Sequence, residues 1–385
     1  MNTNNNVSIS QLPIEILLRI FWHCTTWQRK NHAHLANPTN IEWLHFSHVC
    51  RSWRVASLNE PRLWNFPIFR APKLAEEMLR RSKSAALELA FPGNDPRGLP
   101  LLFEQMDRIG SLTLVSMKTS ELKILSTRLS CKDAKALHSL TITGYRSEKP
   151  YTFSADFLRN GTPVLTNLYL DRSILAWDSP LFRGLRSFTF ISDSGGYRPT
   201  EMQLLGALMG MRSIETLHLV DALPEVLDST ISKIIHLPNL IHLDITDESF
   251  RCFHFLDHIS LSSATKVAMT CRTNSHGNNH AHSLFNQLPR IVAYVSSRCR
   301  RLEAVKGLTI DCRGPVFDSS GVYGRKIDLT IACYSSVQGE ILAYPCLDPD
   351  FKLCMELAFR YNDSVGEVVE SLLGAVPLAE VAALR

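Results

Sequence analysis

The chain has 385 residues, 45% of them hydrophobic, and its 41 Lys and Arg against 37 Asp and Glu give a formal net charge of +4. Residues 1–70 carry this whole excess, with seven basic and three acidic residues, so the remainder is balanced. A nucleic-acid reader normally shows a concentrated basic face, and this balance argues against one. No apolar run approaches the roughly 18 residues that span a membrane.

The first residues and the cysteines indicate a reducing environment. The segment Met1 to Asn6 is polar and lacks the basic-then-apolar layout of a secretory signal. Ten cysteines are scattered without paired spacing, which is not the pattern of a disulfide framework. We expect a protein of the cytoplasm, the nucleus or both. Four cysteines in apolar contexts are expected to be reduced core residues: Cys50, Cys252, Cys333 and Cys354.

Residues 12–21, LPIEILLRIF, are too apolar for a helix that buries only one face. Pro13 can open a helix because its missing N–H would have no partner there, and Glu15 suits the first turn. Ile16 and Ile20 form a second apolar strip, so the helix needs two burial partners: its own small domain and, as one option, another protein. The first strip follows the spacing of a buried face: Ile14, Leu17, Leu18 and Phe21.

A second stretch continues the helical pattern. Arg51, Ser52 and Arg54 supply its polar side, and residues 61–64 read as a turn followed by a bulky apolar anchor. A unit of about 60 residues with three or four short helices has a thin core, so docking on a partner would stabilise it. Taken singly, such stripes are more often core than interface. The apolar residues at helical spacing are Trp43, Phe46, Cys50 and Trp53, with Val49 beside them.

Three phrases in this order, LPIEIL, VCRSWR and PRLW, resemble the F-box, and the last two resemble those of F-box proteins from mushroom-forming fungi. The resemblance covers residues 8–66, although the polar segment Thr25 to Asn40 is longer than in the shortest F-boxes. It implies an F-box domain at residues 8–70 that docks on a Skp-type adaptor and, through it, on a cullin. The resemblance places these residues at or beside positions that bind the adaptor or support its binding: Leu12, Pro13, Ile16, Ile20, Val49, Trp53 and Trp64.

Beyond about residue 72, a Leu-x-Leu-like phrase returns at steps mostly between 20 and 29 residues, the period of a leucine-rich repeat. Each phrase alternates apolar with polar residues, which predicts a short strand with one buried face. Helix-like stretches lie between phrases, for example Glu201 to Met211 and Pro224 to Ile235. The phrases begin at Leu87, Leu112, Leu140, Leu168, Phe188, Leu217, Leu243, Val267, Leu308 and Leu329.

These observations predict an α/β protein: a small all-helical F-box, then an irregular leucine-rich-repeat solenoid with a curved parallel sheet over residues 71–385. The repeat count stays open, since the usual asparagine after the strand is mostly absent. Most outward polar residues are expected to be ordinary solvated positions; a subset could bind a target protein, represented by Tyr145, Arg172, His218 and Asp244. Further residues expected to point outward are Arg146, Asp171, Asp193, Asp247 and Glu248.

Motifs of catalysis and metal binding are missing from the sequence. It contains no Gly-x-Ser-x-Gly, phosphate-binding Gly-rich loop, His-Glu-x-x-His or paired Cys-x-x-Cys. The inserted segment 274–282 has three histidines but no cysteine or carboxylate at ligand spacing. We therefore predict no enzyme, no cofactor and no metal.

The resemblance implies the substrate-recognition subunit of a Skp–cullin–F-box ubiquitin ligase, which supports ubiquitin-dependent protein degradation by proximity. The alternative is a non-catalytic leucine-rich-repeat scaffold without ligase activity. The target protein cannot be identified from the sequence. At the end of the chain, Leu378 to Arg385 resembles the start of another repeat, so the final strand is expected to be incomplete or absent, with an exposed edge that promotes association.

Overall fold

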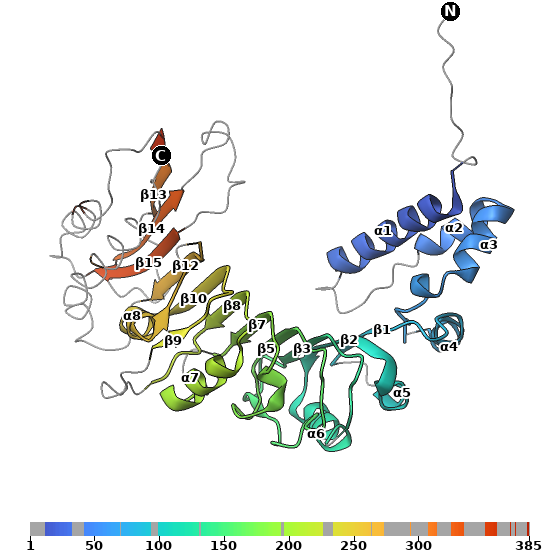
Figure 1. The fold of residues 1–385 in the computed structure, drawn as a ribbon, viewed down its shortest axis with the longest axis horizontal. Coiled ribbons are helices and arrows are strands. Elements are labelled where there is room, and N and C mark those ends of the chain that lie inside the picture. Colours follow the sequence, from blue (N-terminus) through green and yellow to red (C-terminus); the bar gives the residue numbers. More distant parts are fainter. Residues whose placement is uncertain are drawn as a thin grey trace, which may run out of the picture. The chain divides into compact units, whose positions relative to one another are not determined.

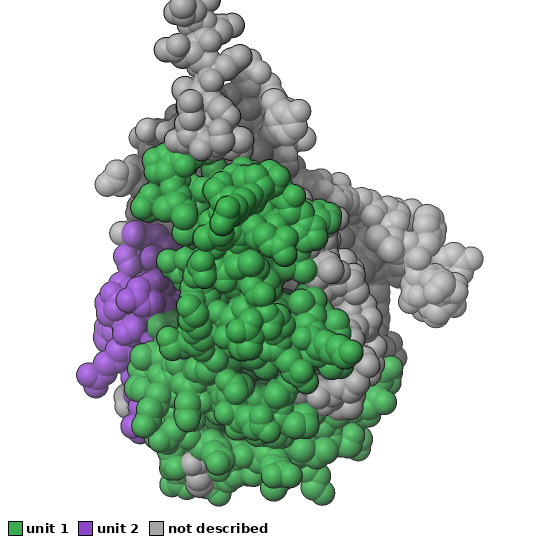
Figure 2. Space-filling view, turned by 90° about the vertical axis from the view of Figure 1, so that its right-hand side faces the viewer, with its two compact units in different colours: residues 1–181 green, residues 182–385 purple. Residues whose placement is uncertain are grey.

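The computed structural model describes residues 12–32, 42–69, 71–93, 99–130, 132–193, 196–225, 234–262 and 264–272, and then mainly the strands 307–313, 325–334, 351–359 and 383–384. The chain divides into two compact units, residues 1–181 and 182–385 (Figure 2). The division at residue 181 does not test the predicted boundary between the F-box and the repeat region at residue 70, which stays a prediction. In the described part of the chain, no helix is both long and apolar enough to cross a bilayer.

Unit 1 begins with a helical region that runs to residue 81 (Figure 1). The expected helix over residues 43–53 is divided, because Cys50 is extended, with φ −156° and ψ 172°, and separates two helices. The elements of this N-terminal helical region are α1 (Ile14–His32), η2 (Glu42–His45), α2 (Phe46–Val49), α3 (Arg51–Asn59), η3 (Pro61–Leu63) and α4 (Pro72–Arg81).

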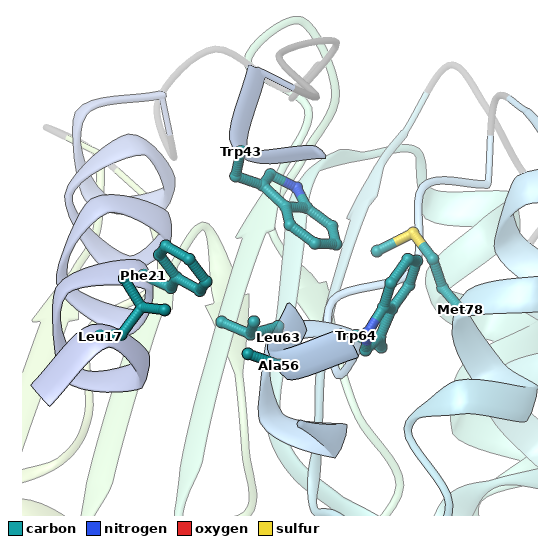
Figure 3. Packing of buried hydrophobic residues seen from close by; sticks show 7 residues of the cluster. All are labelled: Leu17, Phe21, Trp43, Ala56, Leu63, Trp64 and Met78. Carbon is teal, nitrogen blue, oxygen red and sulfur yellow. The ribbon is translucent and has the colours of Figure 1, made fainter. Parts of the chain in front are cut away.

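Aromatic and aliphatic side chains from all parts of this region share one core (Figure 3). Phe21 of α1 is fully buried, stacks on Phe46 at 4.3 Å between ring centroids, and meets the Trp53 ring edge-on at 5.0 Å. Met78 of α4 joins the same cluster, so the core extends past residue 70. The buried members are Leu17, Phe21, Trp43, Ala56, Leu63, Trp64 and Met78.

The remainder of unit 1 is a parallel sheet in the order β1-β2-β3-β5, with helices in the connections (Figure 1). A small second sheet pairs β4 with β6 in parallel. The elements are β1 (Leu87–Pro92), α5 (Leu99–Glu104), η5 (Met106–Arg108), β2 (Ile109–Met117), α6 (Thr119–Arg128), β3 (Ser139–Gly144), β4 (Tyr151–Thr152), β5 (Asn167–Asp171) and β6 (Ser173–Ile174). In sequence, η6 (Pro180–Phe182) crosses from this unit to the next.

Unit 2 has a mixed sheet in the order β7-β8-β10-β12-β15-β14-β13-β16, and β9 pairs separately with β11. Its strands are parallel from β7 to β15, after which β14 runs antiparallel to both β15 and β13. The elements are β7 (Ser187–Ile191), α7 (Glu201–Gly210), β8 (Thr216–Val220), β9 (Ile235–His236), β10 (His242–Glu248), α8 (Ser249–Asp257), β11 (Ile259–Ser260), β12 (Lys266–Arg272), β13 (Gly307–Arg313), β14 (Arg325–Tyr334), β15 (Phe351–Phe359) and β16 (Ala383–Leu384).

All ten Leu-x-Leu-like phrases lie in strands of unit 1 or unit 2, which confirms the strand prediction. In the first eight phrases both apolar residues are buried, and equivalent residues pair across neighbouring strands, as Leu112 does with Leu140 and Leu217 with Leu243. Sequence order and strand order agree only as far as β12. The predicted parallel sheet is found as far as β15; β14 then pairs antiparallel with both β15 and β13, so the sheet is mostly parallel.

Other expectations have mixed outcomes. The predicted helix from residue 201 is α7, whereas Ile235 begins β9 and residues 226–233 lie outside the described residues. Cys50 is exposed, which corrects its assignment to the core, and Cys252 is buried as expected. At the end of the chain, where the final strand was expected to be incomplete or absent, the structure has the two-residue strand β16, which pairs with β13. The segment 274–282 and the side chains of Cys333 and Cys354 lie outside the described residues.

Candidate functional site

Helix α1 presents an apolar face to solvent. Pro13 stands just before the helix, and its carbonyl accepts hydrogen bonds from the N–H groups of Ile16 and Leu17, both at 3.1 Å. Leu17 and Phe21 point into the core, and Leu18 packs against it. Ile16 is 42% exposed and Ile20 is 38% exposed. Pro13, Ile16 and Ile20 follow the spacing of one helix face, so the second apolar strip of the sequence has no covering element among the described residues.

The junction of α2 and α3 adds another exposed apolar residue. Val49, the last residue of α2, is 60% exposed. The neighbouring Cys50 Sγ lies 3.1 Å from Ser52 Oγ, and this hydrogen bond, with backbone N–H groups of α3, lowers the pKa of the thiol. We call Pro13, Ile16, Ile20 and Val49 the exposed apolar set.

The remaining predicted adaptor-binding residues have more interior positions. Leu12 and Trp53 are half-buried, and Trp53 packs on Phe21. Trp64 is buried, and its indole N–H donates to the Ser57 carbonyl at 2.9 Å. Trp64 can therefore support an interface by holding α3 and η3 in place, which is the indirect role that the resemblance allowed.

Sequence reasoning missed three exposed apolar residues near the exposed apolar set. Ile14 was expected in the buried strip, but it is 50% exposed because it begins the first helical turn, outside the reach of the core. Trp22 and Val55 are also exposed. Their neighbours in sequence, Phe21 and Ala56, are buried. Only the position of each residue around the helix distinguishes exposed from buried side chains here, so helical spacing is the signal that could have identified Trp22 and Val55 as exposed.

The predicted target-binding residues fall into two pairs. His218 on β8 and Asp244 on β10 are register partners, and His218 Nε2 lies 3.7 Å from Asp244 Oδ2. Tyr145 and Arg172 follow β3 and β5 in unit 1; Tyr145 is exposed, whereas the Arg172 guanidinium donates to the Glu148 carbonyl and is half-buried. The two pairs belong to different compact units, so each pair is considered alone.

One residue expected to point outward is instead a buried ion-pair partner. Asp247 has no exposed side-chain surface and accepts hydrogen bonds from Arg198 Nη1 at 2.7 Å and from the Leu223 N–H at 3.0 Å. Burial acts to lower the pKa of Arg198, but the hydrogen bond and charge of Asp247, with nearby Asp221, outweigh it and raise that pKa. Arg198 and Leu223 lie 49 and 24 residues from Asp247 along the chain, so no local sequence pattern indicates these partners, and the arrangement links separate segments of unit 2.

The exposed apolar set lies within a segment of the chain that matches a known protein family. The sequence profile of the F-box-like family matches residues 9–70. Residues 9–70 are an F-box-like domain. No curated protein and no solved structure matches the chain.

F-box proteins are usually non-catalytic adaptors in ubiquitin ligases, with a Skp-type protein as the general partner of the domain. The profile ends before β1 and therefore tests neither the leucine-rich repeats nor the fungal resemblance, which stay predictions.

Proposed function

We propose that this chain is the substrate-recognition subunit of a Skp–cullin–F-box ubiquitin ligase. The observation that carries the proposal is the exposed apolar set within the F-box-like domain, residues 9–70. Its members come from the start of α1 and the α2–α3 junction, which carry the first two of the three phrases on which the resemblance rests. A Skp-type adaptor covers this set and links the chain to a cullin in the cytoplasm, the nucleus or both.

The energetics favour a small interface with apolar anchors. Completing the burial of Ile16 and Ile20, each roughly two-fifths exposed, contributes about 1 kcal/mol per side chain. A few such anchors generally account for most of the binding energy of an interface. The helix supplies them on a rigid framework, because Leu17 and Phe21 hold the opposite face in the core.

The repeated strand units serve as the target-binding part in this proposal, as divergent leucine-rich repeats. Between the buried residues of each strand, alternate positions are only half-buried and form a row that crosses neighbouring strands. His218 and Asp244 are adjacent in that row in unit 2. By holding a target near a charged ubiquitin carrier, the chain contributes proximity rather than covalent chemistry.

The test is reconstitution with purified adaptor, cullin and ubiquitin enzymes. Wild-type chain should co-purify with the adaptor and the cullin, and the assembly should form ubiquitin chains. The double variant Leu12→Ala with Pro13→Ala should lose the adaptor, because both residues border α1 at its exposed end. The matched control is Ile124→Ala on α6, a helix residue 50% exposed but distant in sequence from the F-box-like domain.

Each result discriminates between the alternatives. Loss of adaptor binding in the double variant, with unchanged hydrogen exchange in the sheets, supports the proposal. Adaptor binding without cullin recruitment or ubiquitin transfer favours the non-catalytic scaffold. Adaptor binding that the double variant leaves intact contradicts the role of the exposed apolar set.

A further inference from the structure

A buried cluster of one carboxylate and two imidazoles lies between two helices of unit 2. Glu201 is the first residue of α7, His254 lies in the last turn of α8, and His258 directly follows α8. Glu201 and His258 are buried, at 6% and 7% exposure. An ionised carboxylate removed from water needs charged or hydrogen-bonding partners, and the two histidines are positioned to serve.

Local structure fixes the position of all three side chains. A capping box begins α7: the Gln203 N–H donates to Thr200 Oγ1 at 3.3 Å, and the Thr200 N–H donates to Gln203 Oε1 at 2.9 Å. Glu201 is therefore held at the first helical position. The two histidines are four residues apart, which places them on one side of the α8 terminus. Their rings lie 4.6 Å apart between centroids.

The donor atoms converge on one carboxylate oxygen. Glu201 Oε1 lies 3.0 Å from His254 Nε2 and 3.5 Å from His258 Nε2. One ligand atom from each residue falls within 4.8 Å of those of the other two. Tetrahedral zinc, with bonds to nitrogen and oxygen of about 2.0–2.2 Å, requires ligand atoms about 3.3–3.5 Å apart. The two separations from Glu201, 3.0 and 3.5 Å, are already close to this range, and the two histidines also lie within 4.8 Å of one another by one ligand atom each.

The hydrogen bond of His258 decides which nitrogen faces the cluster. Its Nδ1 lies 2.9 Å from the His254 carbonyl oxygen, which can only accept, so Nδ1 carries a hydrogen. In the neutral ring, the Nε2 lone pair is then directed at an oxygen of Glu201. A cation placed between this lone pair and the carboxylate oxygen would contact both. Metal-binding histidines generally have this pattern, with the second ring nitrogen donating to a backbone carbonyl.

A pocket beside the cluster leaves room for a further ligand. Its empty volume is about 230 Å³ including its opening, and the enclosed part accommodates about one water molecule. Arg251 also lines the pocket, but its guanidinium donates to the Pro224 carbonyl at 2.7 Å and to Glu248 at 3.2 Å. Because these contacts direct its charge to other oxygens, Arg251 does not replace a cation between the three donors.

We propose that Glu201, His254 and His258 bind a divalent transition-metal ion of the zinc class, with water as the fourth ligand. Two imidazoles with a single carboxylate suit zinc better than calcium or magnesium, which prefer oxygen ligands. The ion links α7 to α8, two helices with 38 residues between them in the sequence. Its role is structural: it holds successive repeat units together and neutralises the buried carboxylate.

Cobalt(II) titration of the full chain, after treatment with a chelator, tests the proposal directly. We expect one Co²⁺ per chain, the strong visible absorption of tetrahedral cobalt, and displacement by Zn²⁺. Zn²⁺ alone should raise the thermal unfolding midpoint of the chelator-treated chain. Glu201→Gln and His254→Gln should each weaken Co²⁺ binding at least tenfold, since both keep the side-chain size but remove a ligand.

Two controls exclude other sites. His236→Gln, at an exposed histidine of β9, should bind Co²⁺ like the wild type. The triple change of His276, His280 and His282 to Gln should also retain the signal. Footprinting with diethyl pyrocarbonate needs no variant: Zn²⁺ should reduce modification of His254 several-fold and leave His236 unchanged.

Absence of the tetrahedral spectrum overturns the proposal, as does binding that persists in both Glu201→Gln and His254→Gln. A signal lost only in the triple variant assigns the ion to the segment 274–282 and likewise overturns it. If the single variants fail to fold, the wild-type footprint decides, and unprotected His254 contradicts the site. The adaptor takes no part in these measurements, so their outcome is independent of the proposed ligase role.

Discussion

Similar aliphatic residues are exposed on one face of α1 but buried in the strands of the sheets. Leu112 and Leu140 are fully buried on neighbouring strands, whereas Ile16 and Ile20 leave roughly two-fifths of their surface in solvent. Both sets are aliphatic and regularly spaced. The difference lies in what covers them, because each inner strand has a neighbouring strand and connecting helices, whereas nothing described covers this face of α1.

This contrast separates a residue's part in folding from its part in binding. A buried leucine of a strand stabilises the chain by itself, so its replacement should affect stability first. An exposed isoleucine on a helix that is anchored by its other face contributes little to folding. It remains available to a partner. Substitutions in the two classes should therefore affect stability and binding separately.

The largest effect on stability is expected from Trp64. Trp64→Ala removes a buried ring that contacts Trp43 at 5.0 Å between centroids and lies under the Arg81 guanidinium at 4.6 Å. We expect a loss of about 3–5 kcal/mol in the free energy of unfolding of the N-terminal helical region. Urea unfolding with limited proteolysis measures it.

Trp22→Ala is the matched control, since Trp22 is 44% exposed and should cost well under half as much. Equal losses for Trp22 and Trp64 would contradict the assignment of core and surface. Trp53, which is half-buried, should fall between the two.

The next effect is expected at the buried ion pair of unit 2. Asp247→Asn leaves the guanidinium of Arg198, which is 11% exposed, without its closest counter-charge. Removing one member of such a pair costs about 3 kcal/mol, because the remaining charge stays buried. Chemical unfolding followed by hydrogen exchange in α7 and β10 would detect it. Asp244→Asn, at a residue 47% exposed, should change stability by less than about 0.5 kcal/mol.

A smaller effect should appear in target binding without loss of stability. Asp244→Lys reverses a charge in the exposed row beside His218 and is expected to weaken target capture about tenfold. Arg172→Glu, a charge reversal in unit 1, should likewise weaken target capture. Proximity labelling by each variant, compared with wild type and with a chain lacking residues 1–70, measures the change. Capture that instead depends on the segment 274–282 would refute the strand-face interpretation.

The smallest expected effect is a pH dependence at the surface of α4. Arg80 and Arg81 donate to Glu77 and lower the pKa of its carboxyl to about 2. A carboxyl with a lowered folded-state pKa stabilises the chain above its unfolded pKa of 4.5, and this contribution disappears as the pH falls from about 4.5 towards 2. Because the Glu77 side chain is 35% exposed and water screens its charge, the contribution is small. Glu77→Gln should lower stability slightly at every pH above about 4.5 and flatten the stability profile between about pH 4.5 and 2, as circular dichroism can measure; an unchanged slope in that window would refute it.

Much of the fold could be predicted because its signals are local. Apolar and polar residues alternate within a few residues in each strand phrase, so all ten predicted phrases lie in strands. The two apolar strips of α1 could be recognised within ten residues. The break at Cys50 was missed, since the helical spacing of Trp43, Phe46 and Trp53 continues across it. The strand order beyond β12 also could not be predicted. The strand next to β12 is β15 rather than β13, and this pairing depends on residues far apart in the sequence.

The sites show the same limit. The exposed apolar set could be named from phrases that lie within a short stretch of sequence. The ion pair of Asp247 and the cluster of Glu201, His254 and His258 could not, because the partners are separated by tens of residues in the sequence and meet only in the folded chain. The burial of Asp247 itself could have been predicted, because Asp247 has the inward phase of Leu243 and Ile245 on β10.

The central claim is that the exposed face of α1 binds a Skp-type adaptor, and calorimetric titration of the full chain with purified adaptor tests it most directly. Ile16→Asp and Ile20→Asp should each weaken binding at least about 30-fold, equivalent to about 2 kcal/mol, while unfolding in urea stays close to that of the wild type. Ile124→Asp should bind normally. Wild-type affinity in both α1 variants, or an equal loss in Ile124→Asp, would contradict the account.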